Sequence, residues 1–481
     1  MGKGSAPDVP MHPKKSLQLY PRPDNVYTHK SSLNFDLMRT RIFLDRKGTH
    51  TDVYVWLAHA LIAVAVATIA WALAGLEDWF VGGRARIVQS LLDKHEGSSI
   101  TAWLFYAASA ILFVLTASIL TIFVGPGANG SGIAEIMGLL NGINYPGAIG
   151  FRTLLVKAVG TLLAVCGGLC IGKEGPLAHI GANVGTIACH LPFQRFKCLR
   201  NDVIKRQLIA AGASAGVSAA FGAPIGGALF SYEISKPNTF WTFSMLWRVF
   251  FASSLATFLL SIYSSLAEGT TFSLTDSAAL KFGKLEDQES SLLDLPAAIV
   301  IGIVCGGLGA FFIFVNVNLA MIRKRLIKTP ALKLLEACAF AFLTSGLFFG
   351  IVQWRSNTCH NYLEGTNKEE VFKFRCEGRS YNPLGTLIFN TEGGTIRYLL
   401  SYPVVLKQDP KGITDPSISP IPPTDIVLYF LSWYFLTITT YGVWVPAGLF
   451  LPGILIGCSV GIMYFDVMIY GFDFNVNQLG G

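Results

Sequence analysis

Two glycine-framed breaks interrupt the apolar stretches of this 481-residue chain, and each contains one carboxylate. They read GSGIAE at 130–135 and GKEGP at 172–176. In a bilayer, broken helices and bare backbone N–H groups are tolerated only where protein buries them or where they line a water-filled cavity. Helix N-termini that point into such a cavity attract anions, and a glutamate there competes for the same place. The breaks therefore predict an anion pathway with a carboxylate standing in it.

The composition is that of a membrane protein. Hydrophobic residues make up 52% of the chain and charged residues only 14%, whereas a soluble domain carries roughly 25% charge. Much of the net charge of +7 lies in the first 50 residues, just before the first apolar span. This distribution follows the positive-inside rule and places the N-terminus in the cytosol. We therefore expect an integral, multi-pass protein in a lipid bilayer and no nucleic-acid partner.

The order of apolar and polar segments divides the chain into two halves. We expect an N-terminal arm at 1–50, a first transmembrane repeat at 51–266, a polar linker at 267–292 and a second repeat at 293–481. Short apolar pieces alternate with full spans, and a third break, GLFLP, lies at 448–452 in the second half. Repeat-built transporters share this pattern and place their substrate where half-helices end. The fold class expected is an all-α bundle of full-length and broken helices, with a polar loop at 355–424.

Three polar residues in this pattern each have a structural and a functional interpretation. Ser131 would be a natural helix N-cap, but its hydroxyl could instead donate to a bound anion. Glu174 could simply complement a helix dipole, yet a charge at membrane depth costs roughly 2.5–3.5 kcal/mol and usually has a function. Glu233 is more simply a helix-end charge at the interface, with an internal proton acceptor as the alternative.

Cysteine, histidine and serine residues give weaker signals. No spacing of cysteines and histidines suggests a metal site. Cys359 and Cys376 both fall in the polar loop, where a disulfide would form only if the loop faces an oxidising compartment, so the pairing stays open. The sequence GASAG at 212–216 fits a hydrolase motif around Ser214, but a close helix-packing face explains its small residues more simply. We therefore do not expect an enzyme.

Taken together, the three breaks resemble the signatures of the CLC chloride channel and transporter family, in the same order and at suitable spacing. The resemblance runs from about residue 33 to 465. It implies two inverted repeats, with Ser131 at the central anion and Glu174 as the gating, proton-accepting glutamate. It also implies that backbone groups of the three motifs line the anion site: Gly132, Ile133, Gly172, Lys173, Gly175, Leu449 and Phe450. Serine at 131 implies a preference for chloride.

Other segments are similar to the late-endosomal and lysosomal branch of the family. They are SYNPLGTLIFN at 380–390, FGAPIGGALFS at 221–231 and LWRVFFAS at 246–253. This similarity implies chloride/proton exchange in an endolysosomal or vacuolar membrane rather than the plasma membrane. One departure favours a voltage-gated channel without proton coupling, because Ile234 stands where exchangers carry an internal proton glutamate. Glu233 is its neighbour and the possible substitute.

The resemblance also implies helices that would follow Gly481, among them one with a tyrosine at the central anion site. On this basis the second repeat is expected to be incomplete and the chain to be C-terminally truncated. A non-conducting subunit that acts through a full-length partner is therefore a further alternative. Full-length members pair as homodimers, and the paired nucleotide-binding CBS modules of eukaryotic members are not found in this sequence, so we expect no cofactor.

Overall fold

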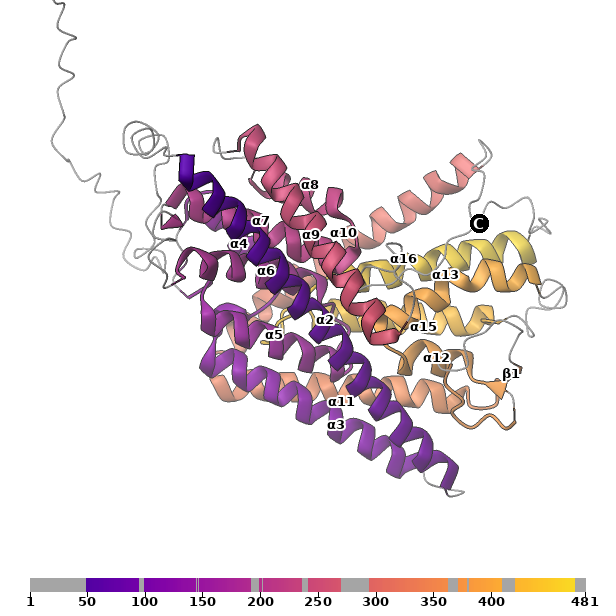
Figure 1. Ribbon diagram of the computed structural model, residues 1–481. Helices are drawn as coiled ribbons and strands as arrows, with labels where there is room; N and C mark the ends of the chain where they lie inside the picture. Colours follow the sequence, from indigo (N-terminus) through magenta and orange to yellow (C-terminus); the bar gives the residue numbers. More distant parts are fainter. Residues whose placement is uncertain are drawn as a thin grey trace, which may run out of the picture.

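The computed structural model describes residues 49–94, 99–143, 145, 147–191, 199–200, 202–235, 241–269, 294–361, 371–378, 380–408 and 420–471. Within these ranges the chain is almost entirely helical (Figure 1), which confirms the all-α class. The expected N-terminal arm and polar linker lie almost wholly outside the described residues. Six described helical segments are long and apolar enough to cross a membrane: Asp52–Asp93, Ser99–Val124, Phe243–Ala267, Leu295–Leu326, Pro330–Trp354 and Phe450–Tyr470. The protein is a multi-pass membrane protein.

Helices of very unequal length make up both halves of the chain. The first half contains α2 (Thr49–Lys94), α3 (Ser99–Ile119), α4 (Ile133–Leu140), α5 (Phe151–Cys166), α6 (Glu174–Cys189), α7 (Asp202–Phe221), α8 (Pro224–Ser235) and α9 (Phe243–Glu268). The second contains α10 (Asp294–Leu326), α11 (Pro330–Trp354), α12 (Pro383–Phe389), α13 (Glu392–Gln408), α15 (Pro423–Thr440) and α16 (Phe450–Asp466). Short turns of other helix types lie at Leu120–Val124, Pro126–Ala128 and Val467–Gly471.

Several helix starts follow directly from local sequence. Thr329 precedes Pro330, and its hydroxyl accepts a hydrogen bond from the N–H of Leu332 at 3.4 Å to begin α11. Asn382 precedes Pro383 in the same way, and its side chain accepts from the N–H of Gly385 at 2.7 Å to begin α12. Proline at the first helical position needs no hydrogen-bond donor, and a capping oxygen satisfies one of the free N–H groups.

The short helix α6 lies at the centre of the first half, buried along almost its whole length. It packs on α7 backbone to backbone, because a Cβ atom on Gly185 would come 2.2 Å from the carbonyl oxygen of Leu208 and one on Gly216 2.3 Å from that of Leu177. The GASAG segment therefore forms a helix-packing face, as expected. Its Ser214 is fully buried and hydrogen-bonds to Ser253 of α9 at 2.6 Å.

The expectation of a polar loop over 355–424 is wrong for residues 383–408, which form α12 and α13. Every residue of α12 is buried, and its apolar side chains join the core between α11 and α15. The segment has the composition of a loop, because it contains several prolines at 403–423 and polar residues on both sides. For this reason the sequence did not predict these two helices.

A disulfide closes the start of this segment. Cys359 and Cys376 are joined, with Cα atoms 5.7 Å apart, so the pairing that the sequence left open is present. Beside it, β1 (His360–Asn361) and β2 (Ser380–Tyr381) pair in antiparallel register, with His360 opposite Tyr381.

The two halves of the chain interlock rather than lie apart. α3 of the first half lies along α11 of the second (Figure 1). α13, α15 and α16 gather on the opposite side of the bundle from the start of α2 (Figure 1). α10 lies on the outside, and none of its membrane-spanning window is buried. This arrangement brings segments from both halves to the interior end of α6.

Candidate anion site

Backbone hydrogen bonds join the three motif segments at one place. The N–H of Gly130 donates to the carbonyl of Val445 at 3.1 Å, and the N–H of Ala447 donates to the carbonyl of Gly130 at 3.0 Å. Gly172 and Gly448 exchange two hydrogen bonds of 2.8 Å. Because α4, α6 and α16 begin at these three segments, three helix N-termini meet here. Free N–H groups and helix dipoles at such ends favour a negative charge between them.

Glycines, which have no side chain, allow these segments to approach one another closely. A Cβ atom on Gly175 would lie only 2.5 Å from the hydroxyl oxygen of Ser131 and 3.5 Å from the Cα atom of Gly448. Gly132 caps α4 with φ of +86°, and a Cβ atom there would clash with the imidazole of His179. Ser131, Gly175 and Gly448, one residue from each motif, are therefore neighbours. The structure brings together the motif residues that the sequence singled out.

Glu174 is the first residue of α6 and is only 1% exposed. Neither of its carboxylate oxygens has a hydrogen-bond partner among the described residues. Its Oε2 atom lies near Gly172, where a Cβ atom would be 2.5 Å away. An ionised carboxylate that is buried and unpaired is costly. Glu174 can relieve this cost by taking up a proton or by turning toward water, which are the two properties that a gate needs.

Lys173 turns its side chain away from this cluster. Its ammonium forms a buried ion pair with Glu77 of α2, and both residues are less than 10% exposed. At the N-cap position of α6, Lys173 can therefore serve an anion only through its backbone. The ion pair connects the start of α6 to α2.

A second buried lysine binds residues 128–131, which we call the serine loop. It is not among the residues predicted from the sequence. Lys157 of α5 is fully buried, and its ammonium donates to the carbonyls of Gly130 at 2.7 Å and Ala128 at 3.0 Å. These carbonyls belong to the segment that leads to Ser131. The signal was present in the sequence, because a lysine within the apolar span 151–171 is costly unless it has partners.

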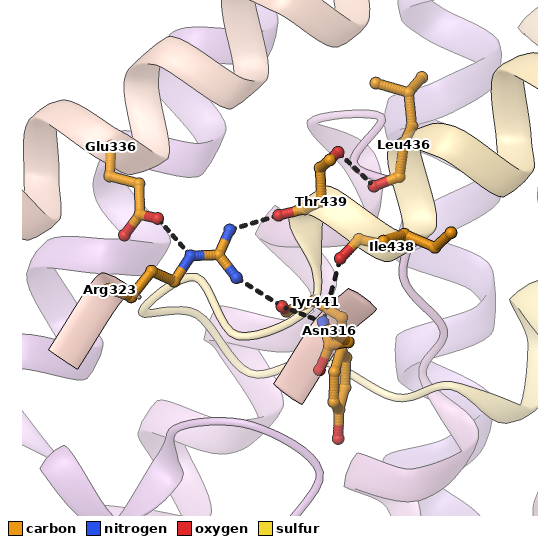
Figure 2. Close-up of polar contacts among 7 residues, drawn as sticks. All are labelled: Asn316, Arg323, Glu336, Leu436, Ile438, Thr439 and Tyr441. Atoms are coloured by element: carbon orange, nitrogen blue, oxygen red, sulfur yellow. Dashed lines mark hydrogen bonds and ion pairs between the residues drawn. The ribbon is translucent and has the colours of Figure 1, made fainter. Parts of the chain in front are cut away.

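Side chains of α10 bind the end of α15, which leads to the third motif (Figure 2). The guanidinium of Arg323 donates to the carbonyls of Thr439 and, at 2.7 Å, Tyr441. Its Nε atom pairs with Glu336 of α11 at 2.5 Å. The amide of Asn316 donates to the carbonyls of Ile438 and Tyr441, both at 3.0 Å. We call Arg323, Asn316 and Glu336 the α15 clamp. Arg323 and Asn316 donate to the carbonyls at the end of α15, just before residues 442–448 enter the site, and Glu336 pairs with Arg323.

The remaining predicted residues differ in their position on the helices and in their exposure. Leu449 is the N-cap residue of α16, and Ile133 is the first residue of α4. Phe450 is 45% exposed, and its ring contacts that of Phe221 with centroids 5.9 Å apart. Glu233 is exposed near the end of α8, whereas Ile234 is buried in an apolar cluster. In the described part of the chain, no three His, Cys, Asp or Glu side chains are placed to hold a metal ion.

Comparisons with known proteins agree with this geometry. The family model described as "Voltage gated chloride channel" matches residues 113–479. The chain is 33% identical to H(+)/Cl(-) exchange transporter 7 of Rattus norvegicus over 91% of this chain and 55% of that protein. It is 30% identical to chloride channel protein C of Dictyostelium discoideum over 94% of this chain and 60% of that protein. The chain thus spans little more than half the length of these relatives.

The fold is also that of a solved transporter. A slow cyanobacterial Cl−/H+ antiporter superposes with a TM-score of 0.61 at 19% identity, over 89% of this chain and 83% of that one. At this level of identity the likeness concerns the fold alone.

Proposed function

Because this chain belongs to the voltage-gated chloride channel family, we propose that it carries chloride across a membrane in exchange for protons. The observation that carries the proposal is the buried, unpartnered carboxylate of Glu174 beside the meeting point of three helix N-termini. Such a place favours one negative charge, which either the carboxylate or a chloride ion can supply. The name of the rat relative, an exchange transporter, supports exchange over a simple pore.

In the proposed cycle Glu174 and chloride compete for the same site. The ionised carboxylate closes the path, and a proton on it removes its charge so that the side chain gives way to chloride. The Ser131 hydroxyl donates to the ion, together with backbone N–H groups at Gly132, Ile133, Leu449 and Phe450. Gly172, Lys173 and Gly175 supply the backbone around the gate. One proton on Glu174 then moves opposite to chloride, which couples the two ions without a further cofactor.

The setting of this activity is part of the proposal. The similarity of three segments to the endolysosomal branch favours an endolysosomal or vacuolar membrane. The basic residues before α2 favour a cytosolic N-terminus. The family resemblance of the three motifs implies a homodimer as the working state of the full-length protein.

A chloride channel without proton coupling is the second candidate, and a specific observation favours it. Ile234 is buried among apolar side chains at the place where an internal proton glutamate would be expected, and the neighbouring Glu233 is exposed. A channel needs no internal acceptor. Glu233→Ala tests the possible substitute, because it impairs proton flux only if Glu233 supplies protons from the inner side.

The deciding experiment measures chloride and proton flux together in vesicles that contain the full-length protein. A chloride gradient should drive proton movement, and Glu174→Ala should abolish it while chloride flux continues. Chloride flux without proton movement in the wild type would establish the channel instead. Unchanged anion flux, gating and pH dependence in Glu174→Ala would refute the role of Glu174.

A further inference from the structure

A small, partly open space adjoins the Glu77–Lys173 ion pair and is lined by charged residues that the proposed cycle does not use. It offers about 40 Å³ to the centres of water-sized molecules, between α2, α3, α12 and α13. Glu77 and Arg84 of α2 line it, together with Tyr106 of α3 and Asn390, Thr391 and Glu392 at the start of α13. A water molecule needs roughly 10–15 Å³ by this measure and two to four polar partners. The cavity therefore has room for about three waters and polar groups to bind them.

Two oppositely charged residues on its wall each have one polar atom without a hydrogen-bond partner among the described residues. Glu392 is 9% exposed, and its Oε2 atom has no hydrogen-bond partner among the described residues. Arg84 is 8% exposed, and the same holds for its Nη1 atom. The guanidinium stacks over the ring of Tyr106 at 4.3 Å. Because a buried charge without partners is costly, bridging water between Glu392 and Arg84 is the arrangement that satisfies both.

The charge balance favours water over an anion. The carboxylate of Glu77 is neutralised by Lys173, and the cavity wall carries one further acid, Glu392, and one further base, Arg84. No positive charge is left over to hold chloride. The charged groups that act on Glu392 are Glu77, Glu174 and Lys173, and its own charge acts on Cys166, Cys170 and Tyr429. Arg84 lines the same cavity.

The cavity lies between the gate and the disulfide-bearing segment. On one side, Glu77 bonds to Lys173, the residue before Glu174. On the other, α2 continues from Arg84 to Gln89, whose amide donates at 2.8 Å to the carbonyl of Phe374, close to Cys376. α13 follows the same segment in the chain. Of the two acids that line the cavity, Glu392 has a carboxylate oxygen without a hydrogen-bond partner among the described residues, and its charge interacts with that of Glu174.

We propose that Glu392 and the water beside it pass protons between Glu174 and the face of the membrane that bears the disulfide. The inference rests on the proposed exchange and adds a second proton-carrying carboxylate to it. In each transfer an O–H bond of the Glu174 carboxylic acid breaks, cavity water relays the proton, and an O–H bond forms on Glu392. Arg84 orients the water and stabilises the Glu392 carboxylate once the proton has left.

The test measures the ratio of proton to chloride flux for the full-length protein in vesicles. Glu392→Gln keeps the size of the side chain but cannot carry a proton, so proton flux should fall on the order of 10²-fold while chloride flux persists. Glu392→Asp should retain coupled proton flux. Glu377→Gln is the matched control, because Glu377 is exposed in the disulfide-bearing segment and its loss should change nothing.

The outcomes separate this inference from the proposed function. Wild-type coupling in Glu392→Gln, together with lost coupling in Glu174→Ala, would overturn the inference and leave exchange intact. A wild-type protein that moves no protons would overturn exchange itself. If Glu392→Gln does not fold, infrared difference spectra of the wild type decide. A carboxylic acid band that appears on acidification and shifts in Glu392→Asp supports the relay, and its absence refutes it.

Discussion

At the scale of single residues, the buried Lys157 of α5 holds in place the loop that leads to Ser131. Its ammonium binds two carbonyls of the serine loop and is fully buried. Lys157→Met should leave those carbonyls without a donor and remove a positive charge near the anion. We expect chloride binding to weaken about tenfold, which corresponds to about 1.4 kcal/mol. Chloride-dependent thermal unfolding of the purified protein measures the change in affinity.

The control for this prediction is Lys324→Met, which removes an exposed lysine from α10. Its effect on stability should stay within about 0.5 kcal/mol, with unchanged chloride binding. Equal chloride affinities for Lys157→Met and the wild type would show that the lysine only supports the fold.

Which site residues could be predicted depended on whether their signal is local. Glu174 and Ser131 stand in glycine-framed breaks and are conspicuous in an apolar chain. Glu392 lies in a stretch whose composition is that of a loop, so its burial could not be foreseen. The neighbours Ser131, Gly175 and Gly448 come from three distant segments. Their meeting depends on helix packing, which spacing along the chain does not report.

At the scale of elements, the α15 clamp fixes how the third motif enters the site. Arg323 joins three elements, because it bonds to two carbonyls at the end of α15 and pairs with Glu336 of α11 (Figure 2). Arg323→Gln should leave the largely buried carboxylate of Glu336 without its ion-pair partner. Loss of one partner of a buried ion pair costs about 3 kcal/mol or more. We expect a clearly lower melting temperature and slower chloride flux in the same variant.

The neighbouring Arg325→Gln is the matched control, since Arg325 is exposed on the same helix turn. Adding Glu336→Gln to Arg323→Gln should recover part of the lost stability, because no unpaired charge then remains. Equal melting temperatures for Arg323→Gln and Arg325→Gln would rule out the clamp.

Elements can be predicted where an apolar run is continuous, and they are missed where prolines and polar residues interrupt it. The apolar runs at 331–353 and 133–141 correspond to α11 and α4. α12 and α13 were missed because both lie among prolines and charged residues. Tertiary burial, rather than local composition, makes α12 an interior helix.

At the scale of the whole molecule, two independent features define opposite faces. α2 begins next to the basic N-terminal residues, and Gln89 near its other end contacts the disulfide-bearing segment. α10 ends in Arg323, Lys324 and Arg325, after which α11 runs the length of the membrane to the same segment. Positive residues favour the cytosolic side, and a disulfide favours an oxidising compartment. Both features therefore predict the same orientation.

This orientation predicts where an inserted glycosylation acceptor is modified. An Asn-X-Thr sequence placed after the exposed Gly378, beside Cys376, should receive a glycan, because it faces the lumen or the outside. The same insertion after the exposed Lys328, between α10 and α11, should stay unmodified. A mobility shift that glycosidase removes is the readout. A glycan at Lys328 and none at Gly378 would invert the topology and place the Glu392 cavity on the cytosolic side of the gate.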